Sequence, residues 1–285
     1  MSTTKLASRG WYHAMGKAIE QLHQDSFPAA LLEAFQRAFT FDTSLILIFP
    51  TDSIPILVHQ QDAAGLMEKK GQVGDYFDGI YLLDPLYQVA MLQPDAGLYS
   101  LKEVTPDNFY RSEFYKRHFA YTNLKDDINY LQPIEGVGTV IINIGSKRRF
   151  SLGEMNRFRA IEPWVLSMMQ CHWGEAASRQ QVSSEHINLH QQLTASFQNF
   201  GRSQLTDREC DIVQMILRGH SSKSAALKLD ISGETVKAHR RNIYKKLGLQ
   251  SQAELFSLFL SALATQSKET AYADPLEAYL AQLDD

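Results

Sequence analysis

The sequence has few cysteines and lacks long apolar runs. Its two cysteines in 285 residues, Cys171 and Cys210, lie in different expected helices, so a disulfide framework is excluded. No apolar run approaches the ~20 residues that span a bilayer. Residues 1–9 lack the apolar core of a secretory signal. The sequence therefore predicts a soluble cytoplasmic protein without a membrane partner.

Motifs of catalysis and metal binding are also missing. We find no glycine-rich phosphate loop, nucleophile elbow or zinc motif. His186 and His190 are four residues apart, a spacing that suits metal ligands on a helix, but their surroundings are polar and contain no third ligand. We interpret this stretch as a solvated linker that is partly helical around 186–200. We predict no enzyme activity, no catalytic residue, no cofactor and no metal site.

Residues 204–264, in contrast, contain a regular series of helix starts and stops. Thr206 stands three residues before Glu209, which is the capping-box pattern, and Gly219 ends the helix that follows. A short helix over 221–229 leads through a turn at Asp230 to a third helix, which Ser232 caps. A fourth helix is expected over 252–263. The pattern predicts a compact all-helical domain of four helices.

The third helix, 235–250, is the basic element of this domain. Its apolar residues recur at helical spacing and form an inward face, while its charged residues are all basic. Such a helix can dock by one side and enter the DNA major groove by the other. A merely solvated charged face is the alternative, but the caps and turns agree with one architecture. The basic residues are Lys237, Arg240, Arg241, Lys245 and Lys246.

The charge of the chain is unevenly distributed. The whole chain carries −4, yet residues 203–263 hold nine Lys or Arg and six Asp or Glu, which gives +3. The remainder therefore carries −7. Because attraction to DNA depends on the local field, the regional charge favours DNA binding.

Residues 204–263 resemble the LuxR-type helix-turn-helix domain, which NarL- and FixJ-type response regulators share. The resemblance is carried by LTDRE at 205–209 and SGETVKAHRRNIYKKLGLQSQAEL at 232–255. Asp230 replaces the usual glycine, but Asp tolerates a left-handed conformation better than most residues. The resemblance implies contacts to base edges from Lys237, Ala238 and Arg241, and contacts to the DNA backbone from Thr235, Arg240 and Lys245.

The fourth helix has an apolar stripe with two interpretations. In the resembled family this helix forms the dimer contact on DNA, and an intramolecular core is the alternative. The stripe consists of Leu255, Leu258, Phe259 and Ala262.

The N-terminal part alternates helices and strands in the order ααββααβαββα. Apolar runs predict strands, among them 43–49 and 138–144, and an aromatic-rich helix is expected over 107–120. A long closing helix over 152–173 begins at the capping pair Ser151 and Glu154. We predict an α+β fold, an αβα sandwich around a five-stranded antiparallel sheet. This order resembles GAF/PAS-like sensor domains and the acyl-homoserine-lactone-binding domain of LuxR-type quorum regulators. A phosphoacceptor receiver is excluded because the chain opens with helices and the first strand ends without an acidic pair.

Tyr76 and the pair Asp84-Pro85 resemble the Tyr…Asp-Pro signature of the quorum regulators. That resemblance implies a tyrosine that lines a ligand pocket and a carboxylate that accepts a hydrogen bond from the ligand amide. The spacing is one residue short and the preceding tryptophan is absent, so the effector is left open. A structural helix start at Asp84-Pro85 and an aromatic core are the alternatives. The candidate ligand residues are Tyr76, Tyr81, Asp84, Tyr99, Tyr110, Tyr115 and Asn129.

We therefore predict four regions: a sensing or dimerisation domain over 1–173, a linker over 174–203, the helix-turn-helix domain over 204–264 and an acidic tail over 265–285. The tail contains a short amphipathic helix after Asp274, which either frays or docks on the protein itself. The sequence indicates a bacterial, nucleoid-associated transcription regulator, without a cofactor, that responds to a small-molecule effector. The expected partners are double-stranded operator DNA with two half-sites, a second copy of the chain and RNA polymerase. The alternative is a ligand-free dimerisation or protein-interaction module at the N-terminus.

Overall fold

A computed structural model describes residues 6, 8–62, 76–176, 184–265 and 273–284. The chain divides into two compact units. The first draws on 1–73, 86–104 and 122–183, and the second draws on 74–85, 105–121 and 184–285. In the described ranges, no helix is long and apolar enough to cross a membrane.

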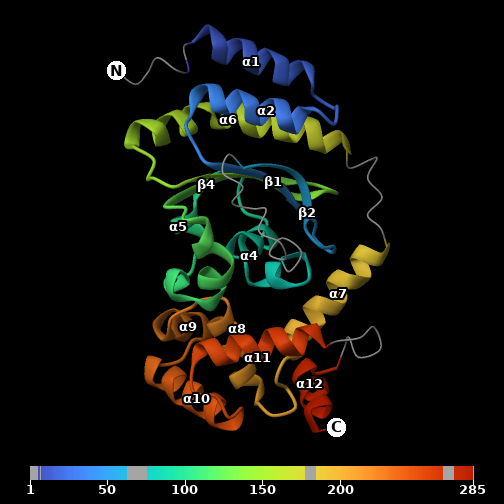
Figure 1. The fold of residues 1–285 in the computed structure, drawn as a ribbon, viewed down its shortest axis with the longest axis vertical. Helices are drawn as coiled ribbons and strands as arrows, with labels where there is room; N and C mark the ends of the chain where they lie inside the picture. The colour runs from blue at the N-terminus through green and yellow to red at the C-terminus, as the bar shows by residue number, and fades with distance from the viewer. Residues whose placement is uncertain (1–5, 7, 63–75, 177–183, 266–272, 285) are drawn as a thin grey trace. The chain divides into compact units, whose positions relative to one another are not determined.

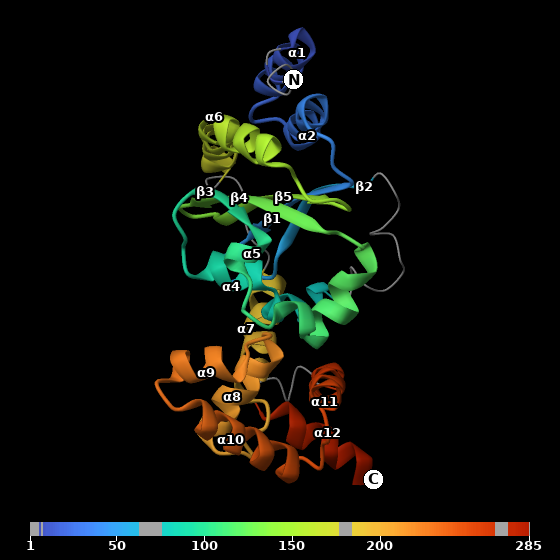
Figure 2. The ribbon, with the colours of Figure 1, turned by 90° about the vertical axis from the view of Figure 1, so that its left-hand side faces the viewer.

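The first unit is built on a five-stranded antiparallel sheet in the order β2-β1-β5-β4-β3 (Figures 1 and 2). The central strand β5 pairs with β4 along its full length and with β1 over residues 139–145, as its largely apolar sequence favours. The sheet confirms the predicted fold class and differs from the parallel sheet of receiver folds. The strands are β1 (Thr43–Phe49), β2 (Ile56–Asp62), β3 (Gly97–Ser100), β4 (Asp126–Ile134) and β5 (Gly138–Ser146).

Three helices lie on one side of this sheet: α2 (Phe27–Ala38) and α6 (Leu152–Ala176) cover its face, and α1 (Arg9–Glu20) packs on α2 further from the strands (Figures 1 and 2). Alternate strand residues such as Ile142 and Tyr130 point into the core under these helices, and both are fully buried. The short helices α4 (Pro85–Met91) and α5 (Leu101–Val104) lie on the other face (Figures 1 and 2). There Thr139 of β5 donates a hydrogen bond of 3.1 Å to the carbonyl of Ala90.

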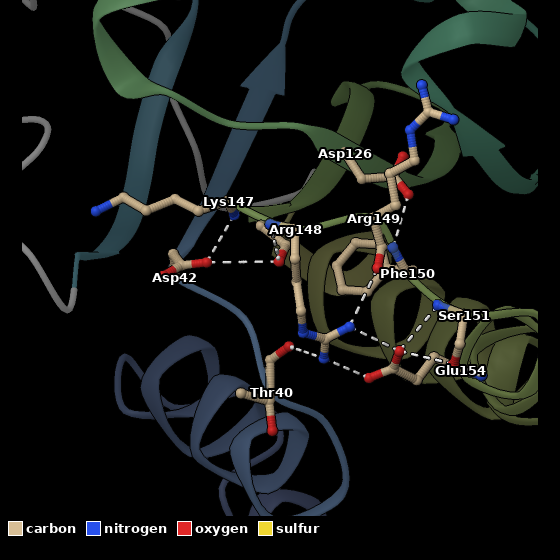
Figure 3. Close-up of polar contacts among 10 residues, drawn as sticks. Thr40, Asp42, Asp126, Lys147, Arg148, Arg149, Phe150, Ser151 and Glu154 are labelled. Atoms are coloured by element: carbon tan, nitrogen blue, oxygen red, sulfur yellow. Dashed lines mark hydrogen bonds and ion pairs between the residues drawn. The ribbon is translucent and has the colours of Figure 1, made fainter.

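A polar cluster fixes the start of α6 (Figure 3). Arg148 donates to both carboxylate oxygens of Glu154, at 2.9 and 2.6 Å, and also reaches the carbonyl of Thr40. Glu154 in turn accepts from the amide and hydroxyl of Ser151, which confirms the predicted capping pair. Asp42 accepts from the amide of Lys147 at 2.7 Å. The connection from β5 to α6 is therefore tied to the connection from α2 to β1.

The second unit is helical in its C-terminal part, residues 184–284. It also contains the short turns η1 (Ile80–Leu83), η2 (Phe109–Arg111) and η3 (Tyr115–Phe119), and η4 (Ala120–Thr122) follows the last of these. The predicted continuous helix over 107–120 is wrong: the backbone is extended at Ser112, whose hydroxyl accepts from the amide of Tyr115 at 3.1 Å. The helices are α7 (Ser184–Asn199), α8 (Asp207–Leu217), α9 (Ser222–Leu229), α10 (Gly233–Lys246), α11 (Gln252–Ala264) and α12 (Pro275–Asp284).

The ends of α8, α9 and α10 follow the sequence closely. Thr206 and Glu209 form the reciprocal capping box, and Ser232 caps α10 by accepting from the amide of Thr235. Asp230 adopts the left-handed conformation with φ 52° and ψ 51°, as expected for the residue in place of glycine. Local side-chain chemistry therefore sets the helix-turn-helix geometry.

Two segments at the edges of the helical domain are also ordered. Helix α7 lies in the stretch interpreted as a linker, and it buries Leu193 and Phe197. Helix α12 packs against α11, so the tail docks on the protein and is not frayed over 273–284; the part before 273 lies outside the described residues.

Candidate DNA interface and ligand site

Helix α10 presents its basic side to solvent. Val236 and Ile243 are fully buried and fix the helix against its neighbours. Of the six residues expected to contact DNA, Thr235, Lys237, Arg241 and Lys245 are exposed, while Ala238 and Arg240 are half-buried. The structure therefore gathers the predicted residues on one helix, with its long basic side chains accessible.

Ion pairs hold part of this helix in place. Lys246 donates to Glu209 at 2.6 Å, which joins the end of α10 to the capping box of α8. Burial acts to raise the pKa of Glu209, but Lys246 and the capping bonds from Thr206 outweigh it and lower the pKa below its ordinary value. Lys246 is exposed but engaged in this ion pair, and it therefore serves the fold.

The basic residues expected to contact DNA differ in what they already bind. Lys237 donates to Glu234 at 2.7 Å, and Arg240 donates to the hydroxyls of Ser222 and Tyr244 at 3.4 and 3.3 Å. Arg241 forms no hydrogen bond to any residue that the structure describes. Its guanidinium is therefore ready to donate two parallel bonds, as a guanine edge or a phosphate requires.

Most of the residues expected at a dimer contact are buried in the hydrophobic core of a single chain. Leu255, Phe259 and Ala262 are fully buried, and the ring of Phe259 meets Phe197 edge-on at 5.5 Å. Leu258 is half-buried. A dimer contact through α11 therefore has the half-buried Leu258 available, while the other three residues fill the core of one chain.

Asp274 anchors the tail helix. Its carboxylate accepts from the amides of Gly201 and Ser203, both at 2.8 Å, and from the hydroxyl of Ser203 at 2.7 Å. The next residue but one, Leu276, is fully buried. The sequence shows the helix start at Asp274-Pro275 but gives no sign of these partners, which lie more than 70 residues away.

Three of the candidate ligand residues lie close together in the second unit. Tyr76 donates to the carboxylate of Asp84 at 2.7 Å, and Pro85 begins α4 directly after it. Tyr81 is fully buried and shares a hydrogen bond of 2.9 Å with Nδ1 of His190 on α7. The interpretation of His190 as a solvated residue is wrong, because the apolar side of α7 carries it into the interior.

Tyr110 and Tyr115 belong to an aromatic cluster in the same unit. Their ring centroids are 5.1 Å apart, and each ring also packs on the fully buried Phe109. Tyr110 is half exposed, at 53 %. The cluster has a packed centre and an accessible edge.

Tyr99 and Asn129 lie opposite each other on β3 and β4 in the first unit. Asn129 is fully buried and donates to the carboxylate of Asp127 at 2.8 Å, and Asn143 of β5 donates to both residues. Tyr99 donates to the carbonyl of Asp95 at 2.8 Å. The sequence analysis did not single out Asp127. Asp127 and Asn129 are two residues apart in β4, so the strand period already placed both side chains on the same face of the sheet.

The described residues of the first unit also contain a pocket of about 610 Å³ beside the β4–β5 turn. Phe49, Met91 and Val137 contribute to its walls, and none of the candidate ligand residues does. Within the described ranges, no group of three or more His, Cys, Asp or Glu residues is placed to hold a metal ion.

Comparisons with known proteins found similarities for both the C-terminal helices and the N-terminal sheet domain. Residues 203–259 match the family described as "Bacterial regulatory proteins, luxR family". An HTH-type transcriptional regulator of the exeN 3' region of Aeromonas salmonicida is 28% identical over 191 residues, which cover 64% of this chain and 95% of that protein. The nitrate/nitrite response regulator NarP of Escherichia coli is 35% identical over 95 residues, which cover 32% of this chain and 43% of NarP.

A solved structure resembles the N-terminal part. The LBD domain of VqsR from Pseudomonas aeruginosa superposes with a TM-score of 0.52 and 28% sequence identity. The superposition covers 58% of this chain and 98% of that domain. The chain therefore combines a sheet domain similar to the LBD domain of VqsR with a C-terminal segment that matches the luxR family.

Proposed function

We propose that this chain, whose residues 203–259 match the luxR family, binds operator DNA in a sequence-specific manner to regulate bacterial transcription. The observation that carries the proposal is the exposed basic side of α10, with Arg241 free of hydrogen bonds within the described residues. Lys237, Ala238 and Arg241 read base edges, and Thr235, Arg240 and Lys245 contact the backbone. The operator has two half-sites because the chain binds as a homodimer, and RNA polymerase is its partner at the promoter.

The N-terminal part controls this binding through a small molecule. Its similarity to the LBD domain of VqsR supports a sensing role. Tyr76 and Asp84 form a donor–acceptor pair, and the tyrosines add hydroxyls beside aromatic faces, a composition that suits a small amphipathic ligand. A ligand that prefers the DNA-competent arrangement shifts the population toward it. The alternative is a ligand-free dimerisation or protein-interaction module.

Selection of duplexes from a random pool by the full-length protein tests DNA binding and yields the operator. With the recovered duplex, Arg241→Ala should weaken binding by about 1–3 kcal/mol and relax the preference at one base position. Arg37→Ala is the matched control, since Arg37 is an exposed arginine of α2 that pairs with its helix neighbour Glu33. An Arg241→Ala variant that keeps wild-type affinity and preference would remove α10 as the reading element.

The effector proposal has its own test. We would purify the protein from its native host, identify co-eluting molecules by mass spectrometry, and measure the melting temperature with small metabolites. A stoichiometric compound that no longer raises the melting temperature of Tyr76→Phe or Asp84→Asn supports the sensor. A protein that retains nothing and responds to nothing supports the interaction module.

A further inference from the structure

Residues 105–121 contact the start of α9 through Asp107. One carboxylate oxygen of Asp107 accepts from the main-chain amide of Ser221 at 3.0 Å, and the other accepts from the Ser221 hydroxyl at 2.5 Å. Ser221 is the N-cap of α9. A carboxylate from a distant part of the sequence is therefore bound at the positive end of a helix of the helix-turn-helix.

The contact favours the charged form of the carboxylate. Burial acts to raise the pKa of Asp107, but the hydrogen bonds from the hydroxyl and amide of Ser221 outweigh it, so the pKa lies below its ordinary value. Asp107 is therefore an anion at neutral pH, and the start of α9 holds it as an anion.

Two further contacts of the same segment accompany Asp107. Gly219, between α8 and α9, approaches Ser112 so closely that an added Cβ would lie 3.1 Å from the Ser112 Cβ. Arg117 donates to the hydroxyl of Ser257 on α11 at 2.8 Å, and its guanidinium lies 5.2 Å from the ring centre of Phe256. Residues 107–117 therefore bind the helical domain at three separate points.

The start of α9 is also adjacent to the recognition helix. Arg240 of α10 donates to the hydroxyl of Ser222, the first residue of α9. In helix-turn-helix complexes the helix before the recognition helix crosses the DNA backbone, and helix N-termini bind phosphate through the same amide and hydroxyl groups that Asp107 uses here. A backbone phosphate at this position would gain the guanidinium of Arg240 as a further donor.

We propose that the start of α9 is a DNA-phosphate site which Asp107 occupies as an internal substitute, so that this contact and DNA binding exclude each other. The inference rests on the proposed DNA-binding function.

Asp107→Asn tests the proposal because it keeps the shape of the side chain and removes its charge. With the duplex recovered by selection, the full-length variant should bind roughly tenfold more tightly than wild type. Glu277→Gln is the control, since it removes the same charge from an exposed position on α12. Ser221→Gly removes the shared hydroxyl and should preserve α9, because an N-cap position tolerates glycine. In the Ser221→Gly background, Asp107→Asn should increase the affinity for the duplex by a smaller factor than it does in the wild-type background.

Hydrogen exchange on the wild-type protein provides a second measurement. Adding the duplex should speed amide exchange across residues 107–117, because the phosphate releases the segment. An Asp107→Asn variant that binds no more tightly than Glu277→Gln, or a bound duplex that leaves this exchange unchanged, overturns the proposal while DNA binding stands. If neither the wild-type protein nor any variant binds a duplex, the proposed DNA-binding function fails instead.

Discussion

Single side chains fix the connections of this protein through bonds to nearby main-chain groups. Glu154 is one example: it accepts from Arg148 and from both donors of Ser151 (Figure 3). Hydrogen bonds from Arg148 lower the pKa of Glu154 from 4.5 to about 2. The carboxylate is thus more stable as an anion in the folded protein than in the unfolded chain.

The pKa of Glu154 predicts a specific loss of stability in acid. Because its folded pKa lies below the unfolded value, its contribution is complete above about pH 5 and disappears as the pH falls toward 2. The shift corresponds to at most about 3 kcal/mol, and screening around the half-exposed Arg148 reduces this to about 1–2 kcal/mol. Glu154→Gln should lower the free energy of unfolding by that amount at pH 7.

Urea titrations between pH 2 and pH 7 measure this effect. The difference between wild type and Glu154→Gln should shrink as the pH falls below about 4. Glu33→Gln removes a carboxylate from an exposed pair with Arg37 and should change stability by less than about 0.5 kcal/mol. A difference that stays constant over the whole pH range would contradict the assignment.

At this scale the sequence predicted contacts of short range and missed those of long range. The caps at Thr206 and Ser151 and the left-handed Asp230 follow from neighbours within four residues. Asp107 and Asp274 bind donors 114 and 71 to 73 residues away, and no local pattern reveals such partners. The contact from Asp107 to α9 therefore required the structure.

Among the secondary-structure elements, the junction of β4, β5 and β1 depends on one glycine. Gly138 has φ +110°, and an added Cβ would lie 2.2 Å from the carbonyl oxygen of Phe49. Both the conformation and the space exclude a side chain, since the obstructing atoms belong to the backbone. The start of β5 can pair with β1 only when this residue has no Cβ.

Gly138→Ala should therefore lower the free energy of unfolding by at least about 2 kcal/mol. Gly16→Ala is the matched control, because Gly16 lies in α1 with nothing within 4 Å of an added Cβ. Alanine there should stabilise by roughly 0.5–1 kcal/mol. Chemical denaturation monitored by circular dichroism measures both. Equal effects of the two substitutions would show that the close approach at Phe49 relaxes freely.

The tail helix α12 gives a second prediction for an element. Asp274→Ala removes the acceptor for the amides of Gly201 and Ser203, and we expect a loss of about 1–3 kcal/mol. Glu277→Ala, at an exposed position of the same helix, should cost less than about 0.5 kcal/mol. Thermal unfolding compares the two. A melting temperature for Asp274→Ala equal to that of the control would mean that the tail does not support the domain.

Elements marked by apolar runs or by local caps were predicted well, and segments shaped by aromatic packing were not. The central strands β1 and β5 are apolar runs, and the long helix α6 begins at the capping pair Ser151 and Glu154. The segment predicted as one helix over 107–120 instead breaks at Ser112, where aromatic rings pack on Phe109. The polar sequence of α7 hid its buried side, because only Leu193 and Phe197 mark it strongly.

Over the whole molecule, charge is separated along the chain. Residues 203–263 carry +3 while the remainder carries −7, so any attraction to DNA comes from a small basic surface on an acidic protein. Long-range attraction to DNA is weak for such a chain, and binding depends on close contacts between basic side chains and phosphates. Ionic strength is the variable that separates phosphate contacts from base contacts.

The salt dependence of DNA binding should therefore be steep and residue-specific. Removing one basic side chain that neutralises a phosphate reduces the slope of log K against log salt by about 0.9. Lys245→Ala should lower the slope by about that amount and weaken all duplexes alike, whereas Arg241→Ala should also change which duplex is preferred. Fluorescence anisotropy with the selected duplex and a scrambled one, from about 50 to 300 mM salt, measures both quantities. Identical effects of the two substitutions on slope and preference would contradict the division of α10 into backbone-contacting and base-reading residues.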